Sequence, residues 1–165
     1  MPREKTHALE SLVDSTDAIS DFAHTIHRLD RRTHRTTLRR AEVELLPSLV
    51  GEVLDFIIDH PGCRIQDAAD SLVIKPSNAS SYVSTLSGQG LVTKYPDETD
   101  RRQVRVCASK TAAANARRVD ETWVSIYRSA LTELAPDDLA AIQDALPALK
   151  RLGDIVAAQI IAQER

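Results

Sequence analysis

The stretch that decides the fold begins with Arg64-Ile-Gln-Asp-Ala-Ala-Asp-Ser-Leu72 and continues through Val73-Ile-Lys-Pro76 into a Ser-rich run. Its first part has apolar residues at helical spacing, which predicts a short helix with one apolar face. Pro76 suits the first position of a second helix, because proline has no backbone N–H to leave unpaired there. Gly88 or Gly90 can end that helix. Its core face, at positions i, i+3, i+4 and i+7, consists of Ala79, Tyr82, Val83 and Leu86.

The opposite face of this second helix is polar and uncharged, with Lys75 at its entry. The face consists of Ser77, Asn78, Ser80, Ser81, Ser84 and Thr85. Short hydroxyl and amide side chains can reach base edges and phosphates when a helix lies in the major groove of DNA. The alternative is a serine-rich helix that only faces water, since serine and asparagine are common on protein surfaces. The two helices together predict a helix-turn-helix, and the polar face alone leaves both functions open.

Two stretches after the helix-turn-helix alternate as strands do, from Leu91 to Tyr95 and from Gln103 to Ala108. A charged turn between them carries Arg101 and Arg102. This pattern predicts a two-stranded wing, in which one of these arginines enters the minor groove, where the negative potential is enhanced if the groove is narrow. Asp100 can pair with Arg102 and fix its direction. The alternative is an exposed hairpin with a solvated charge cluster.

The order of these elements resembles the MarR family of winged-helix transcriptional regulators. The residues that carry the resemblance are Ala68, Ala69, Leu72, Val83, Leu86, Gly90-Leu91-Val92, Asp97, Asp100-Arg101-Arg102, Val104, Val106 and Ser109. The pairing of Gly-Leu-Val with Asp-Arg-Arg at this spacing is the more specific part. The resemblance covers about Leu45 to Ser109 well, and the flanking helices in pattern only.

The resemblance implies a mainly α-helical fold with a small β-wing. Residues 1–44 would form an N-terminal dimerisation helix, residues 45–108 the winged helix-turn-helix that binds DNA, and residues 109–165 the C-terminal dimerisation helices of one compact protomer. It also implies repression relieved by a small apolar or aromatic effector, held between the dimerisation helices and the DNA-binding region. The lining would include Phe22, Ile26, His27 and Trp123.

Helical periodicity extends on both sides of the central region. A first helix is expected from about His7 to about Arg40, and a buried one from Leu45 to His60 with Pro47 in its first turn. After the wing, Ser109 is a good N-cap for a helix from Lys110 to about Leu134. Pro136 opens a last helix, which Pro147 should kink or split in two.

The first and last helices carry long apolar stripes with nothing obvious in the same chain to cover them. Two copies that exchange these stripes would form a symmetric homodimer. Such a dimer would place two recognition helices about one DNA turn apart and would bind double-stranded DNA with an inverted repeat.

The bulk composition is compatible with a DNA-binding protein without favouring one. The formal net charge of the 165 residues is -3, but arginines cluster between Arg28 and Arg40 and again in the wing, and local patches set the attraction for phosphates. No signal peptide or membrane-length apolar run is seen, so a cytoplasmic protein with reduced thiols and no membrane association is expected.

No constellation with the spacing of a catalytic site is present, so no enzyme and no cofactor are expected. Cys63, between Gly62 and Arg64, can be a thiol of low pKa, although a buried structural cysteine is favoured; Cys107 on a strand is interpreted as structural. His24 and His27 lie at i and i+3 and can form a metal-binding pair. The favoured interpretation is that they are polar residues flanking a dimerisation helix, so no metal is expected.

The second helix departs from the family pattern, because it has no arginine where family members often carry one or two. Phosphate neutralisation dominates DNA affinity, so two other hypotheses stay open. In one, the winged-helix dimer acts mainly through protein or ligand contacts. In the other, a thiol-based redox sensor responds to oxidant through Cys63 or Cys107.

Overall fold

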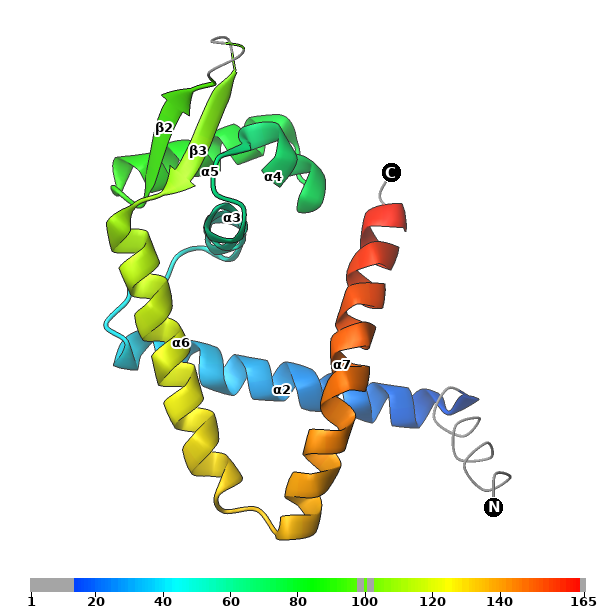
Figure 1. The fold of residues 1–165 in the computed structure, drawn as a ribbon. Coiled ribbons are helices and arrows are strands. Elements are labelled where there is room, and N and C mark those ends of the chain that lie inside the picture. The colour runs from blue at the N-terminus through cyan, green and yellow to red at the C-terminus, as the bar shows by residue number, and fades with distance from the viewer. Residues whose placement is uncertain (1–13, 98–99, 101–102, 164–165) are drawn as a thin grey trace.

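The computed structural model describes residues 14–97, 100 and 103–163. Figure 1 shows a winged helix-turn-helix region joined to long helices. The helices are α2 (Thr16–Arg40), α3 (Ser48–Asp59), α4 (Ile65–Ser71), α5 (Pro76–Gly88), α6 (Lys110–Leu131) and α7 (Pro136–Gln163). The strands are β1 (Cys63–Arg64), β2 (Val92–Pro96) and β3 (Val104–Ala108).

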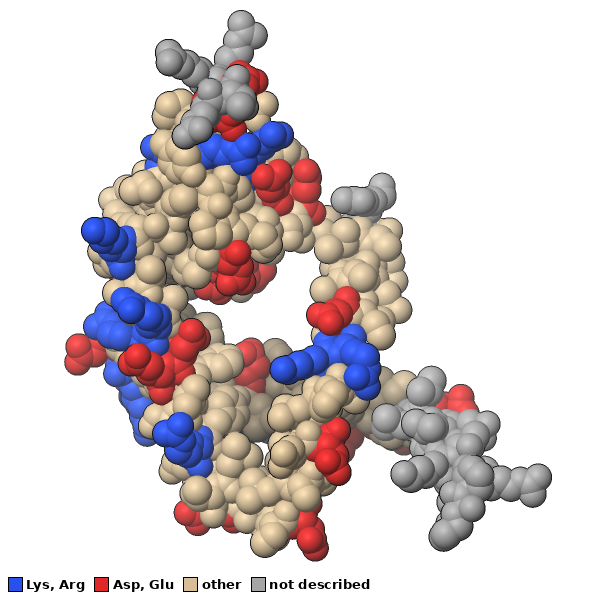
Figure 2. Space-filling model, in the orientation of Figure 1, with Lys and Arg blue, Asp and Glu red and all other residues tan. Residues whose placement is uncertain are grey.

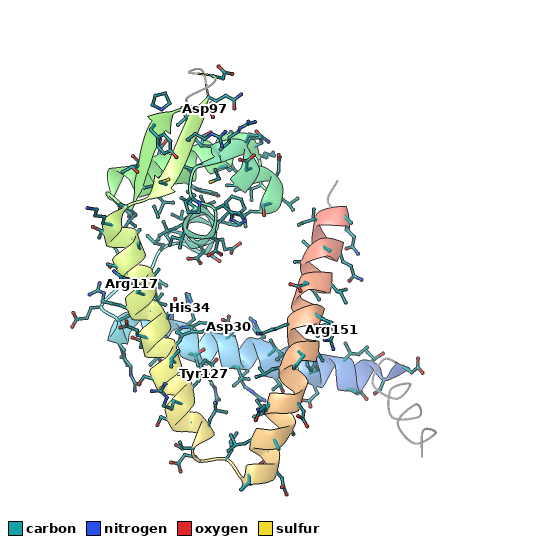
Figure 3. All side chains as sticks on the ribbon, viewed as in Figure 1. Asp30, His34, Asp97, Arg117, Tyr127 and Arg151 are labelled. Carbon is teal, nitrogen blue, oxygen red and sulfur yellow. The ribbon has the colours of Figure 1, made fainter. Side chains whose placement is uncertain are left out.

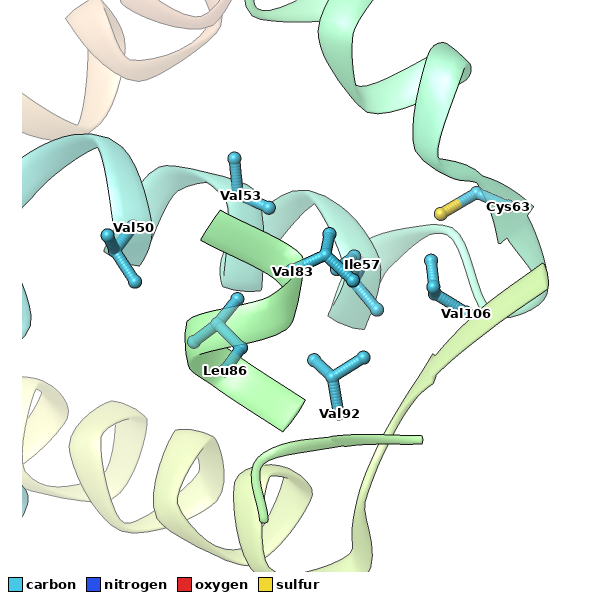
Figure 4. Packing of buried hydrophobic residues seen from close by; sticks show 8 residues of the cluster. All are labelled: Val50, Val53, Ile57, Cys63, Val83, Leu86, Val92 and Val106. Atoms are coloured by element: carbon cyan, nitrogen blue, oxygen red, sulfur yellow. The ribbon is translucent and has the colours of Figure 1, made fainter. Parts of the chain in front are cut away.

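One hydrophobic cluster holds the helix-turn-helix and the wing together (Figure 4). Helix α3 contributes Val50, Val53 and Ile57 to this cluster, and α5 contributes Val83 and Leu86. Cys63, Val92 and Val106 complete it from the three strands. Ile57 and Leu86 are fully buried, so α5 is fixed against α3 by the face that its apolar spacing predicts.

The wing is a three-stranded antiparallel sheet in the order β1-β3-β2, not the two-stranded wing expected from the sequence. The extra strand is only Cys63 and Arg64, which pair with Val106 and Arg105 of β3. Two residues are too few to show strand alternation, so the pattern gave no signal for β1. Strands β2 and β3 pair from Val92 opposite Ala108 to Pro96 opposite Val104.

Several helix boundaries differ from those expected. Helix α2 begins at Thr16, because the Ser15 side chain accepts a hydrogen bond from the Ala18 N–H and caps it; the residues before Asp14 lie outside the described chain. Helix α3 begins at Ser48 rather than Leu45. Proline disfavours helical backbone in the residue before it, so Pro47 keeps the preceding segment extended and precedes the helix instead of lying in its first turn.

The C-terminal helices also differ from the expected bounds. Ser109 caps α6 as expected, by accepting from the Ala112 N–H, but α6 ends at Leu131 instead of about Leu134. Helix α7 is one helix through Pro147, so of the two expected outcomes, a kink or a split, the split does not occur. The missing proline N–H removes one helical hydrogen bond, and the rest of the helix continues on both sides.

Helices α2 and α6 pack against each other, whereas α7 stands apart (Figure 1). No residue of α7 is buried within the chain. Its exposed large apolar residues are Ile142, Leu146, Leu149, Leu152, Ile155, Val156 and Ile160. Helix α2 adds Ile19, Phe22, Ile26 and Leu29 to the exposed apolar surface.

The turns directly before and after α5 both contain a residue with left-handed backbone. Gly90 ends α5 with φ +70°, and the Leu91 N–H then donates to the Leu86 carbonyl at 2.9 Å. Val73 ends α4 in the same way with φ 52°, and the Ile74 N–H donates to the Ala69 carbonyl at 3.0 Å. This pattern normally places glycine at the left-handed position, because a β-branched side chain is strained there.

Replacing Val73 with glycine is expected to raise the free energy of unfolding by about 1 kcal/mol, because left-handed strain costs roughly 1–3 kcal/mol and exceeds the loss of a half-buried side chain. Urea denaturation measures the change. Gly90→Val is the matched control: an added Cβ meets no atom within 4 Å, so that variant reports the backbone strain alone and should be destabilised. A Val73→Gly variant less stable than the wild type would contradict the explanation by strain.

Candidate nucleic-acid interface

Helix α5 presents its polar face to solvent. All six residues predicted on that face, Ser77, Asn78, Ser80, Ser81, Ser84 and Thr85, are exposed. Ala79, Val83 and Leu86 on the other face are buried. Lys75 is exposed and precedes the first residue of the helix, Pro76. The structure therefore brings the predicted helix residues together on one outward surface, which has no charged side chain between Pro76 and Gly88.

Two hydroxyl groups on this face already hydrogen-bond within the helix. Ser84 Oγ donates to the Ser80 carbonyl at 2.8 Å, and Thr85 Oγ1 donates to the Ser81 carbonyl at 3.2 Å. Lys94 of β2 also reaches this face, and its Nζ donates to Ser84 Oγ at 3.1 Å. A basic group therefore lies beside α5, although it comes from the wing.

At the end of its strands next to the turn, the wing is braced by a carboxylate for which the sequence analysis predicted no such role. Asp97 is 6% exposed and forms an ion pair with the Arg105 guanidinium, whose Nη1 also donates to the Gly62 carbonyl at 2.9 Å. The hydrogen bond to Asp97 raises the pKa of Arg105 above its ordinary value. Asp97 follows β2, and Arg105 lies in β3, so this ion pair links the two strands of the wing where they meet its turn.

The turn of the wing is organised around the same carboxylate. Asp97 Oδ1 accepts a hydrogen bond from the Asp100 N–H at 3.1 Å, and Asp100 Oδ2 accepts one from Gln103 Nε2 at 3.1 Å. Figure 2 shows Lys and Arg side chains across the wing. Arg101 and Arg102, predicted to enter the minor groove, lie outside the described residues, as does the expected Asp100–Arg102 pairing.

Cys63 does not have the environment of an activated thiol. Cys63 is buried, and its pKa is raised, first by burial and then by the Asp67 carboxylate nearby. A thiol of raised pKa stays protonated at neutral pH and reacts slowly with oxidants, which is the opposite of the low pKa considered from the sequence. Cys107 is half-buried, with its Sγ 3.5 Å from the Tyr95 hydroxyl.

The residues predicted for an effector site lie on α2 and α6. These two helices contact each other at Thr33 and Tyr127, which is C-terminal to the predicted residues. Tyr127 of α6 contacts Thr33 of α2, with 3.4 Å between their hydroxyl oxygens (Figure 3), and Trp123 packs edge-on against Tyr127 with ring centroids 6.0 Å apart. Phe22 and Ile26, in the N-terminal half of α2, are 38% and 46% exposed. Together with exposed His27, they are therefore not enclosed with Trp123 within one chain.

Two polar groups are left without partners where α2 and α6 pack. Thr37 is fully buried, and its Oγ1 has no hydrogen-bond partner among the described residues; the same holds for the buried Nε1 of Trp123. Buried polar groups are usually paired, so this pair of helices has unused capacity for hydrogen bonds. In the described part of the chain, no group of three or more His, Cys, Asp and Glu is placed to hold a metal ion.

An acidic group lies where the winged helix-turn-helix region meets the long helices. The pKa of Asp55 on α3 is raised, first by partial removal from water and then by the carboxylates of Asp59, Glu52 and Asp120, while His34 of α2 acts in the opposite direction. Charges from three helices, α2, α3 and α6, therefore act on one side chain.

Asp55→Asn is expected to raise the free energy of unfolding at pH 7 by about 0.5 kcal/mol, as is typical for relief of like charges one helical turn apart. The folded-state pKa lies above the unfolded value, so the contribution of Asp55 to stability is present below pH 3.8 and is lost as the pH rises through the folded-state pKa. Urea denaturation at pH 7 and at pH 3 should therefore show a gain only at pH 7. Asp144→Asn on α7 removes the same charge elsewhere and should have no effect; equal gains for the two variants would contradict the local explanation.

The sequence of this chain matches one family model, and its fold is similar to several solved structures. Residues 46–103 match a family model described as the MarR family. RV1404 from Mycobacterium tuberculosis is similar, with a TM-score of 0.75 and 23% sequence identity, over 84% of this chain and 94% of that chain. FabT of Streptococcus pneumoniae, solved in complex with DNA, has a TM-score of 0.68 and 14% identity, over 86% of this chain and 99% of that chain.

A mutant of Staphylococcus aureus MepR bound to an oligodeoxyribonucleotide has a TM-score of 0.58 and 14% identity, over 81% of this chain and 97% of that chain. No curated protein matches the sequence. None of the described helices is long and apolar enough to cross a membrane. The likenesses confirm the predicted mainly helical fold with a small β-wing.

Proposed function

Since residues 46–103 match a model of the MarR family, we propose that the protein is a homodimeric, sequence-specific DNA-binding transcriptional regulator. The match confirms the resemblance that the sequence motifs indicated, and the family and fold are those of transcriptional regulators. The observation that carries the proposal is the outward face of α5, which is polar, exposed and fixed against α3 by buried Val83 and Leu86.

In the proposed complex, α5 lies in the major groove. Ser77, Asn78, Ser80, Ser81, Ser84 and Thr85 face the bases and phosphates, and Lys75 contacts the backbone at the helix entry. Arg101 or Arg102 reaches the minor groove, and Asp100 holds the turn of the wing that carries them. The exposure of the α5 face and the ion pair that braces the wing next to its turn support these roles.

The homodimer is proposed because none of the described residues covers the apolar side chains of α7. Seven large apolar side chains of α7 are 38–53% exposed in one chain. Covering each half-exposed side chain would contribute roughly 1 kcal/mol, which a second copy can supply symmetrically. Residues 1–44 and 109–165 would then form the dimerisation region, residues 45–108 would bind DNA, and the two recognition helices would match an inverted repeat.

We further propose that the protein is a cytoplasmic repressor that a small apolar or aromatic effector releases from DNA. The unpaired Trp123 Nε1 and Thr37 Oγ1 support an effector site at the packed α2–α6 helices, with Phe22, Ile26 and His27 on the adjoining surface of α2. An effector acts only if it binds one arrangement of the two DNA-binding regions better than the other.

Fluorescence anisotropy with DNA from upstream of the protein's own gene tests the proposal, with random DNA as control and at two salt concentrations. Tight, sequence-dependent binding that weakens steeply with salt supports a regulator, since phosphate contacts release counterions. Weak binding to both DNAs, with and without candidate aromatic effectors, would overturn the DNA-binding proposal in favour of a winged-helix dimer that acts through protein or ligand contacts.

A further inference from the structure

Lys94 places a positive charge beside the polar face of α5, which has no charged side chain of its own. Helix α5 has no Lys, Arg, Asp or Glu between Pro76 and Gly88. Affinity for DNA depends mainly on cations that neutralise phosphates. The exposed side chain of Lys94 comes from β2, which packs on α5, and its Nζ donates to Ser84 Oγ at 3.1 Å. The cation is therefore held at the polar face of α5 by a residue of that face.

The hydrogen bond to Ser84 fixes the Lys94 side chain without neutralising it. A serine hydroxyl carries no charge, and the described residues contain no ion pair that involves Lys94. A lysine ammonium has three N–H donors, so two remain for another acceptor after the bond to Ser84. Lysine also loses rotamer entropy when it is ordered, and part of that loss has already occurred before DNA arrives.

The same contact changes the role expected for Ser84. Its Oγ donates to the Ser80 carbonyl at 2.8 Å and accepts from Lys94. Its proton is therefore already committed within the helix. Ser84 is thus suited to orient Lys94 rather than to distinguish one base from another.

We propose that Lys94 is a phosphate-contacting residue of the DNA interface, supplied by β2 to the uncharged recognition helix, and that Ser84 is its positioning residue. This inference rests on the proposed DNA-binding function. It predicts a sequence-independent contribution: Lys94 strengthens binding to any duplex, while the other side chains of α5 distinguish sequences.

The test measures DNA affinity by anisotropy across a series of salt concentrations for the full chain. For Lys94→Met, the slope of log affinity against log salt should become shallower by about 0.9 for each protomer, and affinity at 0.1 M salt should fall roughly eightfold for each lost contact. The fall should be the same for operator and random DNA. Lys94→Arg should keep the slope, and Ser84→Ala should weaken binding about twofold to fivefold with the slope nearly unchanged, because the charge remains but is less ordered.

Lys150→Met on α7 is the matched control, since it removes the same charge away from α5 and β2 (Figure 1) and should leave the slope unchanged. Circular dichroism melting verifies that each variant is folded. A wild type that binds DNA, with a Lys94→Met slope equal to that of the wild type, overturns the inference and leaves the proposed function intact. A wild type without salt-dependent binding to any DNA overturns both.

Discussion

Replacing Leu149 with glutamate is expected to convert the proposed dimer to a monomer and to abolish tight operator binding. Leu149 is 38% exposed on α7 and lies within the apolar stripe that also contains Ile142 and Val156. A charged carboxylate in an apolar interface costs several kcal/mol unless it is paired, and a symmetric interface contains the change twice. At about 1.4 kcal/mol for each tenfold change, the dimer should weaken by more than about a hundredfold.

Analytical ultracentrifugation at micromolar concentration measures the dimerisation, and anisotropy measures the operator affinity. Operator affinity should also fall by about a hundredfold or more, because a monomer reaches only one half-site and loses the gain from linked binding. Ala158→Glu is the matched control, because nine residues along a helix place it on the face opposite Leu149. A Leu149→Glu variant that stays dimeric would contradict the proposed role of the α7 stripe.

The second large effect is expected for Asp97→Ala in the wing. Asp97 accepts hydrogen bonds from the Arg105 guanidinium and the Asp100 N–H, and it is only 6% exposed. Removing a buried carboxylate from a charged hydrogen bond costs about 2 kcal/mol here, less than for a fully buried pair because the Arg105 side chain is 30% exposed. DNA affinity should fall as well, since the turn of the wing loses the group that orders it.

Urea denaturation and DNA titration of the Asp97→Ala variant measure the two effects. Asp70→Ala is the appropriate comparison, because the exposed Asp70 carboxylate accepts from Gln66 Nε2 at 2.7 Å and makes no contact with the wing. That variant should change the free energy of unfolding by less than about 0.5 kcal/mol, as is usual for surface substitutions. Equal losses in the free energy of unfolding for both variants would show that the burial and pairing of Asp97 do not contribute to stability.

The sequence was sufficient to predict the helices and strands whose apolar residues recur at a regular spacing. The apolar residues of α5 recur at helical spacing after Pro76, and the helix is observed with that face buried. The alternation of the two wing strands was equally informative, since β2 and β3 lie within one residue of the expected ranges. Both patterns record which face of an element meets the core, and that information is local.

The rest depends on contacts between distant parts of the chain or on single residues at boundaries. The Arg105–Asp97 ion pair becomes visible only once the register of β2 and β3 is known. The bond from Lys94 to Ser84 depends on how β2 packs over α5. At the boundaries, Ser15 starts α2 inside the range that the periodicity predicted as one helix, because an N-cap side chain can begin a helix without interrupting the apolar pattern.

The lack of charge on α5 also has a kinetic consequence for a protein with the proposed function. A DNA-binding protein finds its site by sliding and hopping along duplex DNA, held there by cations that contact phosphates of any sequence. Here the cation in contact with the polar face of α5 is Lys94 of β2 and not part of the helix, so the search along DNA and the arrest at the operator are expected to depend on different residues. Substitutions of the polar side chains of α5 should shorten the residence time at the operator while diffusion along other DNA keeps its rate.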